Sequence, residues 1–321
     1  MILGSQDGAI EVLWCGQAAG GTVCEGRPLE AIDQLVPWVM FRMLVLQALN
    51  NLSDEQAEYR VRDRLSFTRF LWLGIEDSIP DATTLWLFRE KLAKAGLIER
   101  LFDRFDQHLA AKGYMARGGQ MVDATIVPVP TQRNSRDENE AVKAGRIPEE
   151  WDNKPAKLRQ KDRDARWTKR HGRSFFGYKN HVNADAKHKV IRRYEVTDAA
   201  VHDSQKLDEL LTKGNTSAGV FGDSAYRSSA IEERLRAGGF KSRIHVRATR
   251  KRSLSEAQAN ANHNRSKIRA RVEHVFAAQQ TALGGRIVRT IGIVRARAKI
   301  GLQNLAYNIR RLVTLERIAA A

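Results

Sequence analysis

The chain has 321 residues, of which 42% are hydrophobic, and its formal net charge is +17. These values fit a globular protein with a hydrophobic core, organised as one large domain or two ordinary ones. No stretch approaches about 20 uncharged apolar residues and the N-terminus carries no secretory signal, so we expect neither a membrane span nor secretion. The two cysteines, Cys15 and Cys24, match no zinc or disulfide pattern, which favours a reducing cytoplasm.

The positive charge lies entirely in the second part of the chain. Residues 1–118 contain 13 Lys and Arg against 16 Asp and Glu, a net charge of −3, whereas residues 119–321 contain 41 against 21, a net charge of +20. Nucleic acid is the commonest partner of such a field, through neutralisation of its phosphates. A basic protein that is merely soluble is the alternative.

The first 114 residues predict a helical region after an unassigned start. Residues 1–29 are rich in glycine and show no clear period. Helical spacing of apolar residues then recurs, and Ser53 and Asp81 stand where helix caps are expected. We therefore expect residues 30–114 to form an all-helical domain of four or five short helices. Such helices bind DNA in some proteins and only support the fold in others, and both roles stay open here.

From residue 119 onward the pattern changes to strands that alternate with helices. A basic and polar insert, residues 131–173, is expected to be a loop or partly disordered. Strands are expected over 120–128, 175–184, 190–196, 218–223 and 242–247, and helices over 203–211, 228–237, 261–281 and 294–317. The fold class is therefore α/β: a mixed sheet with flanking helices and a basic C-terminal helical region, preceded by the all-helical domain.

Three acidic residues lie where an unpaired charge would be costly. Asp123 interrupts an apolar strand, Asp223 ends a short apolar run, and Glu273 lies in a helix that is otherwise basic and apolar. Buried carboxylates are usually paired, protonated or bound to metal. Three of them in a strongly basic chain predict a divalent-cation site that acts on a polyanion.

Each of these acids also has a structural interpretation. Asp123 could pair with Arg192 or Lys179 across the strands. Asp223 could cap the turn that follows it. Glu273 could form an ion pair with Arg269, one helical turn earlier.

Several segments resemble the motifs of DDE transposases of bacterial insertion sequences, and insertion-sequence family five matches best. The similar segments, in chain order, are VDATIV (122–127), KLRQKDRDARWTK (157–169), FFGYKNH (175–181), GDSAYRS (222–228) and RARVEHVF (269–276). The resemblance covers about residues 30–315. In the family, a tyrosine, an arginine, the glutamate and a lysine occur at fixed spacing. Arg269 and Glu273 fit this spacing, but Ser266 and Gln280 replace the tyrosine and the lysine.

The resemblance implies an RNase H-like catalytic domain and a DNA-binding or assembly domain before it. It also implies that Asp123, Asp223 and Glu273 are the catalytic and metal-binding triad. Two Mg²⁺ ions are expected there, for which Mn²⁺ can substitute. The implied partners are double-stranded DNA, both element ends and target, and a second copy of the chain in a homodimer on DNA. The expected location is the bacterial cytoplasm, in association with the nucleoid. DNA contacts are expected from Lys179, Tyr226, Arg227, Arg269 and Arg271.

Two other function classes remain open from the sequence. One is a catalytically inactive transposase relative that only binds DNA. The other is a different RNase H-like nuclease. A cleavage assay with Mg²⁺ tests the first, and the presence of strand-transfer products tests the second.

Overall fold

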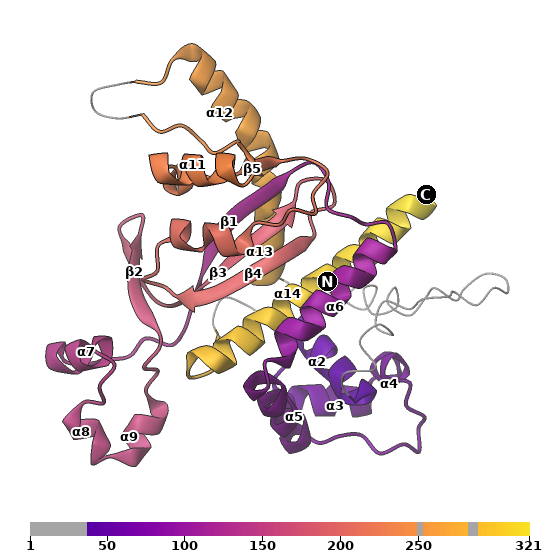
Figure 1. Ribbon diagram of the computed structural model, residues 1–321. Coiled ribbons are helices and arrows are strands. Elements are labelled where there is room, and N and C mark those ends of the chain that lie inside the picture. Colours follow the sequence, from indigo (N-terminus) through magenta and orange to yellow (C-terminus); the bar gives the residue numbers. More distant parts are fainter. Residues whose placement is uncertain (1–36, 249–252, 282–287) are drawn as a thin grey trace.

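The computed structural model describes residues 37–248, 253–281 and 288–321 (Figure 1). Residues 1–29, with Cys15 and Cys24, lie outside these residues, as does the start of the first expected helix. No helix in the described part is long and apolar enough to cross a membrane.

The N-terminal part of the described chain is helical, as expected. Its helices are α2 (Trp38–Asn50), α3 (Asp54–Asp63), α4 (Leu65–Leu71), α5 (Ala82–Lys94) and α6 (Leu97–Ala111). Two of them start at side-chain caps. The Ser53 hydroxyl accepts a hydrogen bond from the Gln56 backbone N–H, and the Asp81 carboxylate accepts one from the Thr84 N–H. These bonds satisfy backbone donors that have no partner inside the helix.

Six strands form one mixed sheet. They are β1 (Gln120–Pro128), β2 (Arg166–Arg170), β3 (Arg173–Asp185), β4 (Ile191–Asp198), β5 (Gly219–Phe221) and β6 (Lys241–Ser242). β3 pairs antiparallel with β1, β2 and β4, while β1, β5 and β6 pair in parallel. The antiparallel strands β4, β3 and β1, continued by the parallel strands β5 and β6, form the RNase H-like arrangement that the resemblance implied, and β2 is an additional strand paired with β3. The strand expected over 242–247 is much shorter.

The basic insert is more ordered than expected. It contains α7 (Arg136–Lys143), α8 (Glu149–Asp152) and α9 (Pro155–Gln160), and β2 joins the sheet. Ser135 caps α7 together with Glu138. The Glu138 carboxylate also accepts hydrogen bonds from the buried Trp151 indole and from Lys157. One carboxylate therefore joins all three helices, a contact that composition alone does not reveal.

The remaining helices connect the strands and cover the sheet. They are η2 (Asp203–Lys206), α10 (Leu207–Leu210), η3 (Ser224–Tyr226), α11 (Ser229–Ala237), α12 (Glu256–Arg269), η4 (Ala270–Val272), α13 (Glu273–Thr281) and α14 (Ile293–Ala320). The helix expected over 261–281 is thus interrupted by a short 3₁₀ segment, η4. This interruption falls directly before Glu273.

Helix α14 joins the helical region to the sheet. It lies alongside α6 and packs on α2, α5, β3 and β4 (Figure 1). One hydrophobic core consequently runs through both parts and includes Leu44, Phe105, Val182, Val275 and Leu305. Ion pairs strengthen the same contact, between Arg295 and Glu90 and between Lys112 and Glu316.

Candidate active site

Asp123 lies in the middle of β1, opposite Val182 of β3, and is only 7% exposed. Its Oδ1 accepts a hydrogen bond from the Ala124 backbone N–H at 2.8 Å. Its Oδ2 accepts one from Arg269 Nη1 at 3.0 Å, which forms an ion pair. The carboxylate is therefore held between the strand and the last residue of α12.

Asp223 follows β5, which is parallel to β1 and adjacent to it. The Asp223 carboxylate accepts a hydrogen bond from the Ala225 N–H at 2.8 Å and so caps η3. The prediction that Asp223 caps the turn after it is therefore confirmed. The cap uses one oxygen, Oδ1, and leaves the partly exposed carboxylate beside the carboxyl end of β5.

Glu273 is the first residue of α13 and is exposed. Its neighbours Val272, Val275 and Phe276 are buried in the main core, as the helical spacing predicted. η4 contacts β1, and α12 contacts β5. The break between α12 and α13 therefore presents Glu273 beside the strands that carry the two aspartates.

The three carboxylates influence each other electrostatically. Burial raises the pKa of Asp123 to about 6. The Ala124 hydrogen bond and Arg269 lower this pKa, while Asp223 and Glu273 raise it. Neighbouring negative charges and poor solvation both disfavour ionisation of Asp123. A bound cation would relieve this repulsion, so the environment of Asp123 favours one.

The described residues contain no group of three or more His, Cys, Asp or Glu side chains arranged to hold a metal ion. Arg269 instead supplies the positive charge next to Asp123 Oδ2. The chemistry of the three acids nevertheless suits a hard divalent cation, because Mg²⁺ prefers oxygen ligands. The donor set fits such a cation, and Asp123, Asp223 and Glu273 would hold it.

The sequence also suggested other pairings for Asp123, and these are wrong. Lys179 forms an ion pair with Asp203 at 2.8 Å and donates to the Val201 carbonyl. Arg192 forms its ion pairs with Asp106 and Asp185. The pairing expected between Glu273 and a preceding arginine is not the one observed either, since that arginine contacts Asp123.

Of the expected DNA contacts, Arg227 and Arg271 are exposed, although each also donates a hydrogen bond to a backbone carbonyl. Lys179 and Arg269 are engaged in ion pairs. Tyr226 is only 1% exposed and belongs to a second core with Val122 and Val220. Stacking of Tyr226 on DNA does not fit this structure, because its ring faces are covered by core side chains.

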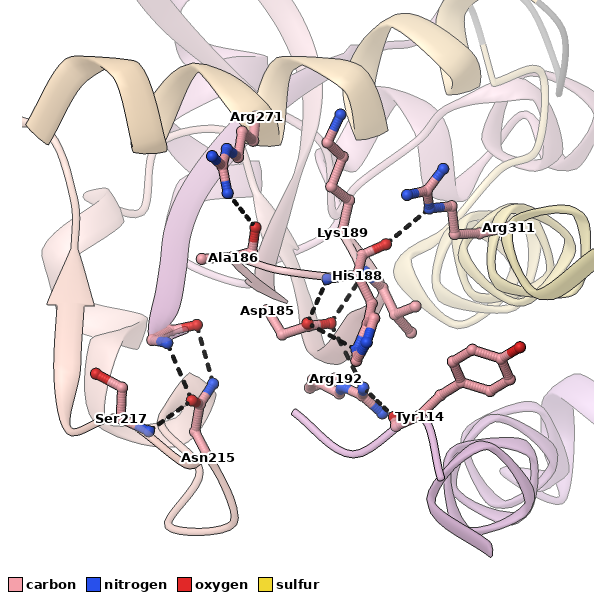
Figure 2. Close-up of polar contacts among 12 residues, drawn as sticks. Tyr114, Asp185, Ala186, His188, Lys189, Arg192, Asn215, Ser217, Arg271 and Arg311 are labelled. Atoms are coloured by element: carbon pink, nitrogen blue, oxygen red, sulfur yellow. Dashed lines mark hydrogen bonds and ion pairs between the residues drawn. The ribbon is translucent and has the colours of Figure 1, made fainter. Parts of the chain in front are cut away.

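Figure 2 shows polar contacts at the start of β1 and in the turn between β3 and β4. At the start of β1, Asn215 exchanges two hydrogen bonds with the Gly119 backbone, at 2.9 and 3.0 Å. In the turn after β3, Arg271 donates to the Ala186 carbonyl at 2.8 Å. Arg269 and Arg271 therefore attach the segment before Glu273 to the sheet at two points. Neither partner could be predicted from the sequence, because both contacts span many residues.

The turn between β3 and β4 is built around a fully buried carboxylate. Asp185 accepts hydrogen bonds from the His188 and Val190 N–H groups, at 2.7 and 3.2 Å (Figure 2). It also pairs with Arg192 at 3.4 Å, and Arg192 in turn reaches Asp106 on α6. This chain of charges connects the turn that receives Arg271 to the helical region.

Comparison with known proteins gives two family matches. A family model described as "Transposase DDE domain" matches residues 115–309, more than half of the chain. A second, "Transposase domain (DUF772)", matches residues 20–91. Among solved structures, the chain is similar to the cryo-EM structure of a piggyBac transposase synaptic complex with hairpin DNA. The TM-score is 0.46 and the identity 11%, over 98% of this chain and 72% of that chain. A likeness at this level adds no evidence on function.

Proposed function

Because the chain belongs to the transposase DDE-domain family, we propose that it is a DNA transposase of insertion-sequence family five. It binds the ends of an insertion sequence, cleaves a strand there and transfers that strand into target DNA. The partners in this proposal are double-stranded DNA and a second copy of the chain on the DNA. The site of action is the bacterial nucleoid.

The observation that supports the proposal is the electrostatic effect of Asp223 and Glu273 on Asp123. They come from β1, from the end of β5 and from the start of α13, and together they alter the pKa of Asp123. Three acids contributed by separate elements to one place in a chain of net charge +17 need a functional reason, since like charges repel. Phosphoryl transfer supplies that reason, because it depends on positioning and charge neutralisation.

The roles divide between carboxylates and cations. Asp123, Asp223 and Glu273 would hold Mg²⁺ or Mn²⁺, which when bound as two ions activates an attacking oxygen and stabilises the leaving one. Arg269 keeps Asp123 in place and balances its charge. The exposed Arg227 and Arg271 lie close in sequence to Asp223 and Glu273 and are suited to contact phosphates near the scissile bond.

The triad is tested by charge-removing substitutions of similar shape. We expect Asp123→Asn, Asp223→Asn and Glu273→Gln each to abolish cleavage and strand transfer on labelled DNA carrying the element end, with Mg²⁺ present. DNA affinity measured in chelator should be retained, because the fold and the basic surface are unchanged. Asp63→Asn, an exposed acid on α3, is the control and should be fully active.

The outcomes separate the possible functions. Near-normal cleavage by one of the three variants would remove that residue from the triad. Cleavage by the wild-type protein without strand-transfer products would indicate an RNase H-like nuclease instead. Binding of element ends without cleavage would indicate an inactive relative.

A further inference from the structure

A second basic site lies away from the triad. A pocket of about 320 Å³ opens between α5 and α14 and is closed by residues 289–291. Its volume falls in the range of small-ligand pockets. Its lining includes four cationic side chains and one acid: Arg89, Arg289, Arg295, Lys299 and Glu90. None of these residues belongs to the elements that carry the three carboxylates.

Two of the four cations are already neutralised. Arg89 pairs with Asp54 through two hydrogen bonds, at 2.6 and 2.8 Å. Arg295 pairs with the buried Glu90 through two more, at 2.8 and 2.9 Å. The first pair joins α5 to α3 and the second joins α14 to α5. Both fix a guanidinium group, so the pocket walls are organised before any ligand arrives.

The other two cations lack a partner. In the described part of the chain, the side chains of Lys299 and Arg289 form no ion pair or hydrogen bond, although the Asp54 carboxylate acts electrostatically on Lys299. Lys299 is poorly solvated and lies near the positive charge of Arg89, and both effects lower its pKa to about 8. A poorly solvated ammonium group is energetically costly unless an anion pairs with it. Asp54 acts on Lys299 but already pairs with Arg89. The four cations of the lining therefore exceed the two acids, Glu90 and Asp54, and this excess of positive charge suits an anion from outside the protein.

We propose that this pocket binds a backbone phosphate of DNA, through Lys299 and Arg289, at a point remote from the scissile bond. The inference depends on the proposed function, which makes DNA the partner. Trp86 and Ile291 line the same pocket and are 43% and 37% exposed. They offer apolar surface to the sugar beside that phosphate. The bound strand would bridge the helical region and α14.

The test is binding of a short fluorescein-labelled duplex to the full-length protein, followed by anisotropy in chelator so that no cleavage occurs. Lys299→Gln and Arg289→Gln should each weaken binding by about tenfold, the value of one charge-assisted hydrogen bond. Each should also reduce the slope of log K against log salt by about 0.9. Lys299→Arg should restore binding because it keeps the charge. Lys91→Gln, an exposed cation on α5 outside the pocket lining, is the matched control and should bind like the wild type.

Folding and ligand source are checked separately. The melting temperature of Lys299→Gln should equal or exceed that of the wild type, because the change removes an unpaired, poorly solvated charge. DNA binding by Lys299→Gln and Arg289→Gln at the level of Lys91→Gln would overturn the proposal. The proposal would also be overturned if the pocket bound only free anions. In that case inorganic phosphate would raise the melting temperature of the wild type but not of Lys299→Gln, and the two proteins would bind DNA with equal affinity. Absence of DNA binding by the wild type would instead overturn the proposed function.

Discussion

Asp123 is the residue on which the candidate active site depends, and its environment is unfavourable for a charge. It is buried in a strand, with Asp223 and Glu273 nearby and Arg269 as its ion-pair partner. Burial and the two neighbouring acids together outweigh the arginine, because the pKa of Asp123 rises from 3.8 to about 6. The ionised Asp123 carboxylate therefore destabilises the fold at neutral pH, but it is available to bind a cation.

This cost predicts a pH-dependent effect of Asp123→Asn. The folded pKa exceeds the unfolded one, so the carboxyl stabilises the fold below about pH 4 and loses this contribution as the pH rises through about 6. In chelator at pH 7.5 we expect the variant to be more stable than the wild type by up to about 3 kcal/mol. The difference should vanish near pH 4. Urea unfolding across this pH range measures it, and a destabilised variant at pH 7.5 would show that the Arg269 ion pair outweighs burial.

At the scale of elements, the close approach of α14 to its neighbours depends on Gly301. A Cβ atom at this position would lie 2.4 Å from Tyr194 Oη on β4 and 2.8 Å from Ile98 Cγ2 on α6. The glycine therefore allows the helix to contact the sheet and the helical region at the same point. Glycine normally weakens a helix interior, so its presence here has a packing reason.

We accordingly expect Gly301→Ala to destabilise the protein by about 1–3 kcal/mol through overpacking. In a helix without such neighbours, the same change would stabilise by about 1 kcal/mol. Gly214→Ala is the control, since a Cβ there would meet nothing within 4 Å. Thermal or urea unfolding gives the comparison. Equal stability of the two variants would mean that α14 moves aside without cost.

Residues 119–321 have a net charge of +20, and in the proposed function this charge would govern association of the whole molecule with DNA. Each phosphate neutralised on duplex DNA releases counterions and contributes about −0.9 to the slope of log K against log salt. We expect a steep negative slope, unchanged by Asp123→Asn, because the basic surface and not the triad carries this term. Anisotropy titrations at several salt concentrations measure the slope, and a value near zero would show that this surface does not face DNA.

The sequence alone was enough to predict those features of the protein that depend on the local pattern of residues. Alternation marked β1, helical spacing marked the stripe around Val275, and an acid in an apolar segment marked Asp123. The resemblance of short motifs indicated the transposase family, which the family comparison confirms, and it predicted the three carboxylates as the catalytic residues.

Which residues contact one another could be seen only in the folded structure. The partner of Asp123 lies on α12, the break before Glu273 follows from its packing on β1, and the insert is ordered through the contacts of Glu138. The unpaired Lys299 became visible only when α14 was placed against α5. These contacts join residues far apart in sequence, and their energies depend on burial and geometry that a linear pattern does not contain.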